Sequence, residues 1–191
     1  MTSLRSALTL LREDLQAARD RDPAARSLVE IALGYSGVHA VWAHRITHRM
    51  WREPLLRMPA RLLSQAARIL TGIEIHPGAR LGRRLFIDHG MGVVIGETAV
   101  VGNEVLLFQG VTLGGRSMRH GKRHPTLGDN VTVGAGAKIL GAVSIGSRVQ
   151  VGANAVVITD VPPDHIAVGI PARIRPNPGS SADVDDPAIY I

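Results

Sequence analysis

The sequence predicts an N-terminal α-helical region followed by a parallel β-helix. Two observations indicate the β-helix: an aliphatic residue recurs at every sixth position over long stretches between Ile75 and Val157, and aromatic residues make up only 3% of the chain. A six-residue period is typical of a parallel β-helix, in which each hexad forms one short strand and one turn. Three hexads close a triangular coil, and each coil buries the face of its neighbour. A core with so few aromatic residues must consist of thin layers of Val, Ile, Leu and Ala.

The six-residue period is interrupted twice. Eight positions separate Ile87 from Ile95, so two extra residues lie within the segment DHGMGV. Fourteen positions separate Leu113 from Leu127, so the segment GGRSMRHGKRHP is predicted to form a loop. A solenoid tolerates insertions at its corners, and inserted loops are often where binding occurs. The interruptions divide the aliphatic positions into three registers: Ile75, Leu81 and Ile87; Ile95, Val101, Leu107 and Leu113; Leu127, Val133, Ile139, Ile145, Val151 and Val157.

The N-terminal part of the chain has a different periodicity, with apolar residues at helical spacing. Asp22 is predicted to be the N-cap of a second helix, with Pro23 at the first helical position. We therefore divide the chain into a helical domain over residues 1–72, a β-helix catalytic domain over residues 73–176 and a tail over residues 177–191. The tail is rich in Gly, Ser and Asp, a composition typical of a flexible segment.

The first interruption contains Asp88 and His89 side by side. A neutral histidine can act as a general base near pH 7 when a carboxylate fixes its tautomer. Neighbours on a strand point to opposite faces, so Asp88 is not expected to orient His89. Glu74, one coil earlier, could lie beneath His89 and is the better candidate for that role.

The second interruption is cationic, and Gly114 and Gly115 lie at its root. Arginine binds phosphate or carboxylate groups in a bidentate manner, and glycine lets backbone N–H groups approach a ligand closely. The loop is therefore predicted to bind an anion, either a phosphate or a carboxylate. Its basic and histidine side chains are Arg116, Arg119, His120, Lys122, Arg123 and His124.

Composition excludes several classes of function. The chain has no cysteine, which rules out disulfides, thiolate metal sites and cysteine nucleophiles. The net charge of +6 can attract anionic substrates, but no nucleic-acid-binding motif accompanies it, so no nucleic-acid partner is expected. No apolar stretch approaches the roughly 20 residues of a membrane span, and the N-terminus lacks a secretory signal, so we expect a cytoplasmic protein. His44 and His48 are four apart but have no evident third ligand, so no metal site is expected.

A family resemblance rests on three segments: GIEIHPGARLGRRLFIDHGMGVVIGETAVVGNEVLLFQGVTLGG, KRHPTLGDNVTVGAGAKILG and VPPDHIAVGIPARI. They resemble serine O-acetyltransferase, a family of hexapeptide-repeat acyltransferases. The segments RDPAARS and GVHAVWAHRITHRMW resemble the family's last helices before the β-helix, so the similarity covers nearly the whole chain. The hexapeptides alone indicate a left-handed β-helix, whereas the DHG, GETAV, TLGG and RHP elements indicate serine. The resemblance implies that acetyl-CoA, a co-substrate rather than a bound cofactor, acetylates the serine hydroxyl to give O-acetylserine, the precursor of cysteine.

The resemblance also implies roles for individual residues. His89 matches the general base that deprotonates the serine hydroxyl. Glu74 stands where many members have Asp, the residue that pairs with this base, so the carboxylate is kept but lies one methylene farther from the backbone. Asp22 and Asp88 match the carboxylates that hold the serine ammonium group.

The remaining matches concern the two other parts of the substrates. Arg123 and His124 match the pair that binds the serine carboxylate or approaches the reacting centre. Gly115 and Ala135 match backbone positions that contact the CoA arm. In the trimers of this family the base and the RHP loop belong to neighbouring subunits, so the site is expected to form between subunits.

The resemblance implies a homotrimer, and many members form a dimer of trimers through the N-terminal helices. A C-terminal Ile of family members inserts into O-acetylserine sulfhydrylase, so Ile191 makes that enzyme a candidate partner. Two alternatives stay open: a related acetyltransferase for a sugar or antibiotic hydroxyl, and a non-catalytic hexapeptide scaffold. Opposite charges at the two ends of the predicted site favour a zwitterionic amino acid, and the presence of His89 argues against a scaffold.

Overall fold

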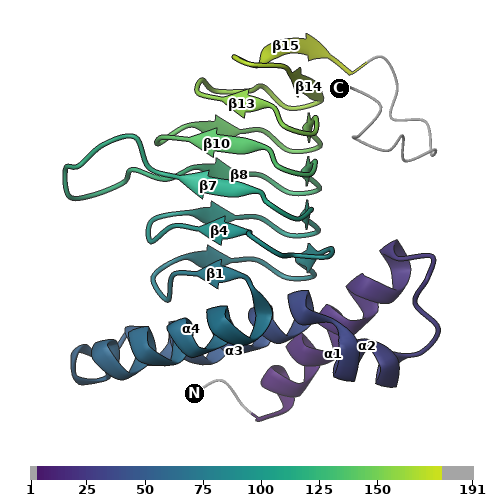
Figure 1. Ribbon diagram of the computed structural model, residues 1–191, viewed down its shortest axis with the longest axis vertical. Helices are drawn as coiled ribbons and strands as arrows, with labels where there is room; N and C mark the ends of the chain where they lie inside the picture. Colours follow the sequence, from purple (N-terminus) through teal and green to yellow (C-terminus); the bar gives the residue numbers. More distant parts are fainter. Residues whose placement is uncertain (1–3, 178–191) are drawn as a thin grey trace.

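The computed structural model describes residues 4–177, in which helices lie at one end of a tall stack of short strands (Figure 1). No helix in this part of the chain combines the length and apolar character needed to cross a membrane. The helical elements are α1 (Leu4–Arg21), α2 (Leu28–Gly34), α3 (Ser36–Trp51), the 3-10 turn η1 (Pro54–Leu56) and α4 (Arg57–Thr71).

The second helix begins later than the sequence predicts. Its N-cap is Ser27, whose Oγ accepts a hydrogen bond from the Glu30 N–H at 3.1 Å. The prediction that Asp22 caps this helix and that Pro23 begins it is therefore wrong. Asp22 instead stabilises a turn between α1 and α2, where its Oδ1 accepts the Ala24 N–H at 2.8 Å. Serine followed three residues later by glutamate is a strong helix start, and it prevails over the Asp–Pro pair.

The strands form three sheets, and consecutive strands along the chain belong to the first, second and third sheet in turn, except for the last two strands, which both belong to the third sheet. The first sheet contains β1 (Glu74–Ile75), β4 (Val94–Ile95), β7 (Thr112–Gly114), β10 (Lys138–Leu140) and β13 (Val156–Val157). The second contains β2 (Arg80–Leu81), β5 (Val100–Val101), β8 (Thr126–Leu127) and β11 (Ser144–Ile145). The third contains β3 (Phe86–Ile87), β6 (Leu106–Leu107), β9 (Thr132–Val133), β12 (Gln150–Val151), β14 (His165–Val168) and β15 (Arg173–Pro176).

Pairing is parallel throughout except between β14 and β15, which pair antiparallel at the end of the stack. The predicted hexads are confirmed, because aliphatic residues of successive coils stack in register. Ile95 pairs with Ile75 on one side and with Leu113 on the other. Every residue of the three registers is buried except Leu81, which is half-buried in the first coil.

The three sheets meet at three corners, which we name by what each carries. The loop corner joins the first sheet to the second and includes residues 76–79, 96–99 and 115–125. The helix corner joins the second sheet to the third and includes residues 82–85 and 102–105. The bulge corner joins the third sheet back to the first and includes residues 88–93, 108–111 and 134–137. Both interruptions of the period therefore lie at corners, but at different ones.

The hydrogen bonds of the bulge corner show which residues are inserted. The Asp88 N–H bonds to the following coil as the Phe108 N–H does, and the Gly92 N–H bonds to the preceding coil as the Gly110 N–H does. The two extra residues between these equivalent positions are His89–Gly90, with φ of 56° and 72°. The insertion thus consists of the histidine itself and a glycine that tolerates the left-handed conformation.

A second apolar cluster joins the helices to the β-helix. Phe86 of β3 is 2% exposed and packs with Ala18, Ile31 and Val38. Burial of a phenylalanine stabilises by about 1.5–3 kcal/mol. Ion pairs also join α1 to the helix corner, and they are Arg21–Glu104, Arg84–Asp20 and Arg83–Glu13.

Replacing Gly37 by Ala is expected to destabilise the protein by about 1–3 kcal/mol, because α3 approaches β3 too closely to accept a methyl group. A Cβ at Gly37 would lie 2.0 Å from the Ile87 carbonyl oxygen. Urea denaturation measures the change in free energy of unfolding. Gly34→Ala is the matched control, since no atom lies within 4 Å of a Cβ at Gly34. Equal stabilities of the two variants would contradict this packing.

Candidate active site

Carboxylates gather where α1 and α3 meet the bulge corner. The Tyr35 hydroxyl donates a hydrogen bond to Asp22 Oδ2 at 2.5 Å. This hydrogen bond, burial and the charges of nearby carboxylates, including Asp88, raise the pKa of Tyr35 to about 12. Tyr35 therefore stays protonated and acts as a donor to Asp22. Negative charges held close together at a partly exposed corner suit a cationic group such as an ammonium.

The start of α3 holds the bulge in place. Tyr35 immediately precedes the helix, and the Ser36 hydroxyl donates to the His89 carbonyl oxygen at 3.4 Å. Gly37 follows and lies against the end of β3. Ser36 thus contacts the inserted histidine directly, and Gly37 packs against the strand that precedes it.

His89 projects from the bulge with 76% of its side chain exposed. Its Nε2 lies 3.9 Å from Asp88 Oδ2, which is too long for a hydrogen bond. The expectation that Asp88 and His89 point to opposite faces is wrong, because β3 ends at Ile87 and His89 adopts a left-handed conformation. Strand alternation does not apply to residues outside a strand.

Glu74 has a different partner from the one expected. Its Oε2 lies 3.3 Å from Arg68 Nη1 of α4, and both side chains are partly exposed. The structure records no contact between Glu74 and His89. The pairing of these two residues stays a prediction.

The loop corner holds the predicted anion-binding residues. Arg123 Nη2 donates a hydrogen bond to Glu97 Oε2 at 3.0 Å. Within residues 4–177, the other N–H groups of this guanidinium have no side-chain acceptor. His124 is 8% exposed, and its Nδ1 lies 2.9 Å from Thr98 Oγ1. Burial and then the Arg123 charge lower the pKa of His124, so its ring is neutral near pH 7. A guanidinium beside a neutral imidazole suits a carboxylate or another oxygen anion.

The two residues expected to contact the CoA arm lie at different corners. Gly115 belongs to the loop corner, where a Cβ would lie 3.4 Å from His124 Nε2. Ala135 belongs to the bulge corner, and its carbonyl oxygen accepts the Asn154 N–H at 2.8 Å.

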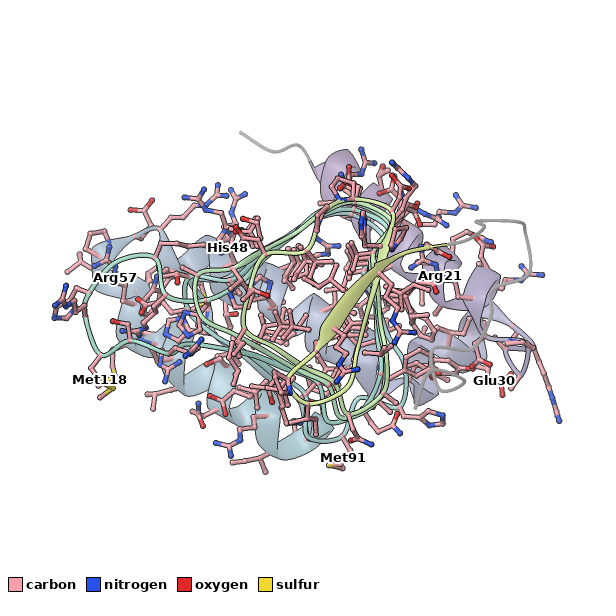
Figure 2. The ribbon with its side chains drawn as sticks, turned by 90° about the horizontal axis from the view of Figure 1, so that it is seen from above. Arg21, Glu30, His48, Arg57, Met91 and Met118 are labelled. Carbon is pink, nitrogen blue, oxygen red and sulfur yellow. The ribbon has the colours of Figure 1, made fainter. Side chains whose placement is uncertain are left out.

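The structure places the predicted site residues at two different corners of one chain. Looking down the β-helix, Met91 of the bulge and Met118 of the loop mark two separate corners of the triangular outline (Figure 2). The bulge corner and the adjoining helices carry Asp22, Asp88, His89 and Ala135, and the loop corner carries Gly115, Arg123 and His124.

Three further residues contact the predicted ones at these corners and were not expected from the sequence. Thr98 and Glu97 contact the predicted residues of the loop corner, and Tyr35 contacts Asp22. The signal for the first two was their place in the GETAV element, whereas Tyr35 carried no signal beyond its position between two helices. The part of the chain that the structure describes contains no group of three or more His, Cys, Asp or Glu residues that could hold a metal ion.

Two family models match the chain. Residues 1–43 match "Serine acetyltransferase, N-terminal", and residues 124–159 match "Bacterial transferase hexapeptide (six repeats)". A serine acetyltransferase of Mycobacterium tuberculosis is 53% identical over 180 residues, which are 92% of this chain and 78% of that protein. A serine acetyltransferase of Bacillus subtilis is 54% identical over 165 residues, which are 86% of this chain and 76% of that protein.

Solved structures agree with these relatives. The Neisseria gonorrhoeae serine acetyltransferase in complex with serine has a TM-score of 0.86 and 43% identity, covering 91% of this chain and 70% of that one. The soybean serine acetyltransferase complexed with serine has a TM-score of 0.86 and 46% identity, covering 90% and 70%. This similarity confirms the predicted left-handed parallel β-helix. The chain belongs to the serine acetyltransferase family.

Proposed function

We propose that this protein is a serine O-acetyltransferase, which transfers the acetyl group of acetyl-CoA to the hydroxyl of L-serine in the cytoplasm. The products are O-acetylserine, a precursor of cysteine, and CoA. The observation that supports this proposal is the bulge corner, where an exposed histidine lies beside carboxylates that suit an ammonium group. Related proteins have been solved with serine bound, in agreement with this chemistry.

In the proposed mechanism His89 removes the hydroxyl proton as the serine oxygen attacks the thioester carbonyl. Collapse of the tetrahedral intermediate breaks the C–S bond and releases the CoA thiolate, which takes up the proton that His89 removed. Asp22 and Asp88 hold the ammonium group, which fixes the hydroxyl beside the base. Glu74 supports His89 after leaving Arg68, a partner to which a partly exposed ion pair binds it only weakly.

The carboxylate end of serine is proposed to bind at the loop corner. Arg123 and His124 bind the carboxylate or approach the reacting carbonyl, and they lie at the loop corner. We propose that three chains assemble so that the loop corner of one subunit faces the bulge corner of the next. Gly115 and Ala135 then line the CoA arm from two subunits.

The activity test uses the purified full-length protein with acetyl-CoA and follows thiol release. L-Serine is expected to react much faster than ethanolamine, which lacks the carboxylate, and than glycerate, which lacks the ammonium group. Acetylation of a sugar or antibiotic hydroxyl without turnover of L-serine would replace this proposal with the alternative acetyltransferase.

Tyr35→Phe is expected to raise the KM for L-serine about fivefold, because one hydrogen bond contributes about 1 kcal/mol to the placement of Asp22. The KM for acetyl-CoA serves as the internal control and is expected to stay unchanged, since Tyr35 lies among the carboxylates that hold the ammonium group. Steady-state kinetics with each substrate varied in turn provides the measurement. An equal rise in both constants would contradict a role specific to serine.

The proposed partner is O-acetylserine sulfhydrylase, with C-terminal Ile191 as the contact. Ile191 lies outside the residues that the structure describes, so the proposal rests on the resemblance alone. A peptide of the last ten residues is expected to bind the sulfhydrylase in competition with O-acetylserine. Absence of competition would remove this partner.

A further inference from the structure

The geometry around His124 fixes which of its ring nitrogens carries the proton. The Thr98 backbone N–H donates to His124 Nδ1 at 3.2 Å, and Thr98 Oγ1 lies 2.9 Å from the same nitrogen. This hydroxyl oxygen already accepts the backbone N–H groups of Arg123 at 3.0 Å and His124 at 3.1 Å. Since both lone pairs of the oxygen are occupied, its only hydrogen points to Nδ1.

Two donors therefore converge on Nδ1, and one of them is a backbone N–H that cannot reverse its role. A neutral imidazole has one donor nitrogen and one acceptor nitrogen, so the proton must reside on Nε2. Protonation of Nδ1 would set its hydrogen against the Thr98 N–H.

We propose that Thr98 is a positioning residue that fixes His124 as the neutral Nε2–H tautomer, so that His124 donates a hydrogen bond to an oxygen anion of the proposed reaction and does not act as its base. The inference rests on the proposed function for the identity of that anion. The two histidines then have different roles. His89 accepts the proton of the serine hydroxyl, whereas His124 donates a hydrogen bond and neither gains nor loses a proton.

The surroundings of Nε2 agree with a donor that is reserved for a ligand. Within residues 4–177 no acceptor is recorded for this atom. The ring lies so close to Gly96 that a Cβ there would be 2.1 Å from Nε2. Of the charged groups near the ring, Arg123 and Lys122 oppose a positive imidazolium and Glu97 favours it, and together with burial they leave the pKa of His124 lowered.

Two oxygen anions have the required chemistry: the carboxylate of serine and the oxyanion of the tetrahedral intermediate. A donor to the carboxylate acts on binding, so its loss raises the KM for serine. A donor to the oxyanion acts only in the transition state, so its loss lowers kcat. Kinetics of the variants below separates these two sources.

The direct test is the tautomer in the wild-type protein, read by long-range 1H–15N NMR of histidine-labelled full-length chain. The His124 signals are assigned by their absence from His124→Gln. The expected result is an unprotonated Nδ1 and a protonated Nε2 near pH 7. A proton on Nδ1, in either the neutral or the charged ring, would overturn the proposal. This readout needs no activity, so it fails independently of the proposed function.

Matched variants test the donor role. Glutamine places an amide N–H near the position of Nε2, whereas asparagine reaches only that of Nδ1. His124→Gln is therefore expected to retain about tenfold more activity than His124→Asn, the value of one hydrogen bond to a charged group. Equal activities of the two variants would contradict a donor at Nε2.

The role of Thr98 is tested by removing its hydroxyl. Thr98→Val is expected to lower kcat/KM about tenfold and to weaken the tautomer preference, while Thr98→Ser restores both. A Thr98→Val variant with wild-type kinetics and an unchanged tautomer would show that the hydroxyl is not the positioning group. If Thr98→Val fails to fold, the NMR spectrum of the wild type still tests the tautomer of His124, and the two His124 variants still test its role as a donor.

Discussion

Replacing His89 by Asn is expected to lower kcat for L-serine by about 100-fold or more, the contribution typical of a general base. The KM for L-serine is expected to change much less, because the proposed mechanism assigns the ammonium group to Asp22 and Asp88 rather than to His89. Asparagine is the right substitution here, since His89 has a φ of 56° and asparagine tolerates the left-handed region. Alanine would add backbone strain and confuse a catalytic loss with a structural one.

Thiol release under saturating substrates measures kcat, and urea denaturation confirms that the variant is folded. His165→Asn is the matched control, because His165 lies on β14 and its Nδ1 contacts the Pro163 carbonyl oxygen, away from both corners. A near-normal rate of His89→Asn would remove His89 from the mechanism.

The repeat and its interruptions could be predicted because their signals are local. A buried residue at every sixth position fixes the coil, and a lost register marks an insertion at a corner. The orientation of the inserted residues could not be predicted. Strand alternation ends at Ile87, and the left-handed turn at His89 brings its ring toward the Asp88 carboxylate.

Contacts between residues far apart in the sequence could not be predicted for another reason. Tyr35 lies 13 positions from Asp22, and Thr98 lies 26 positions from His124, without any periodic pattern to connect them. The partner of Glu74 is likewise set by the packing of α4 on β1, which places Arg68 beside it. Periodicity identifies the scaffold of a solenoid, but the pairing of polar side chains at its corners depends on which turns become neighbours.

Mixing two inactive variants is expected to restore activity. His89→Asn damages only the bulge corner, and Arg123→Ala damages only the loop corner. If each site combines the bulge corner of one chain with the loop corner of the next, every mixed trimer holds one intact site, about a third of its sites. Co-expression of the two chains with different tags, followed by double affinity purification, yields mixed assemblies for the thiol-release assay.

The matched control combines His89→Asn with Asp88→Ala. Both substitutions lie at the bulge corner, so every site of a mixed assembly keeps a damaged bulge corner and no activity returns. Recovery in the first mixture and none in the second requires that residues of two chains share one site. Failure of the first mixture, with mixed assemblies demonstrated by the tags, would mean that a single chain closes its own site, against the separation of the two corners in Figure 2.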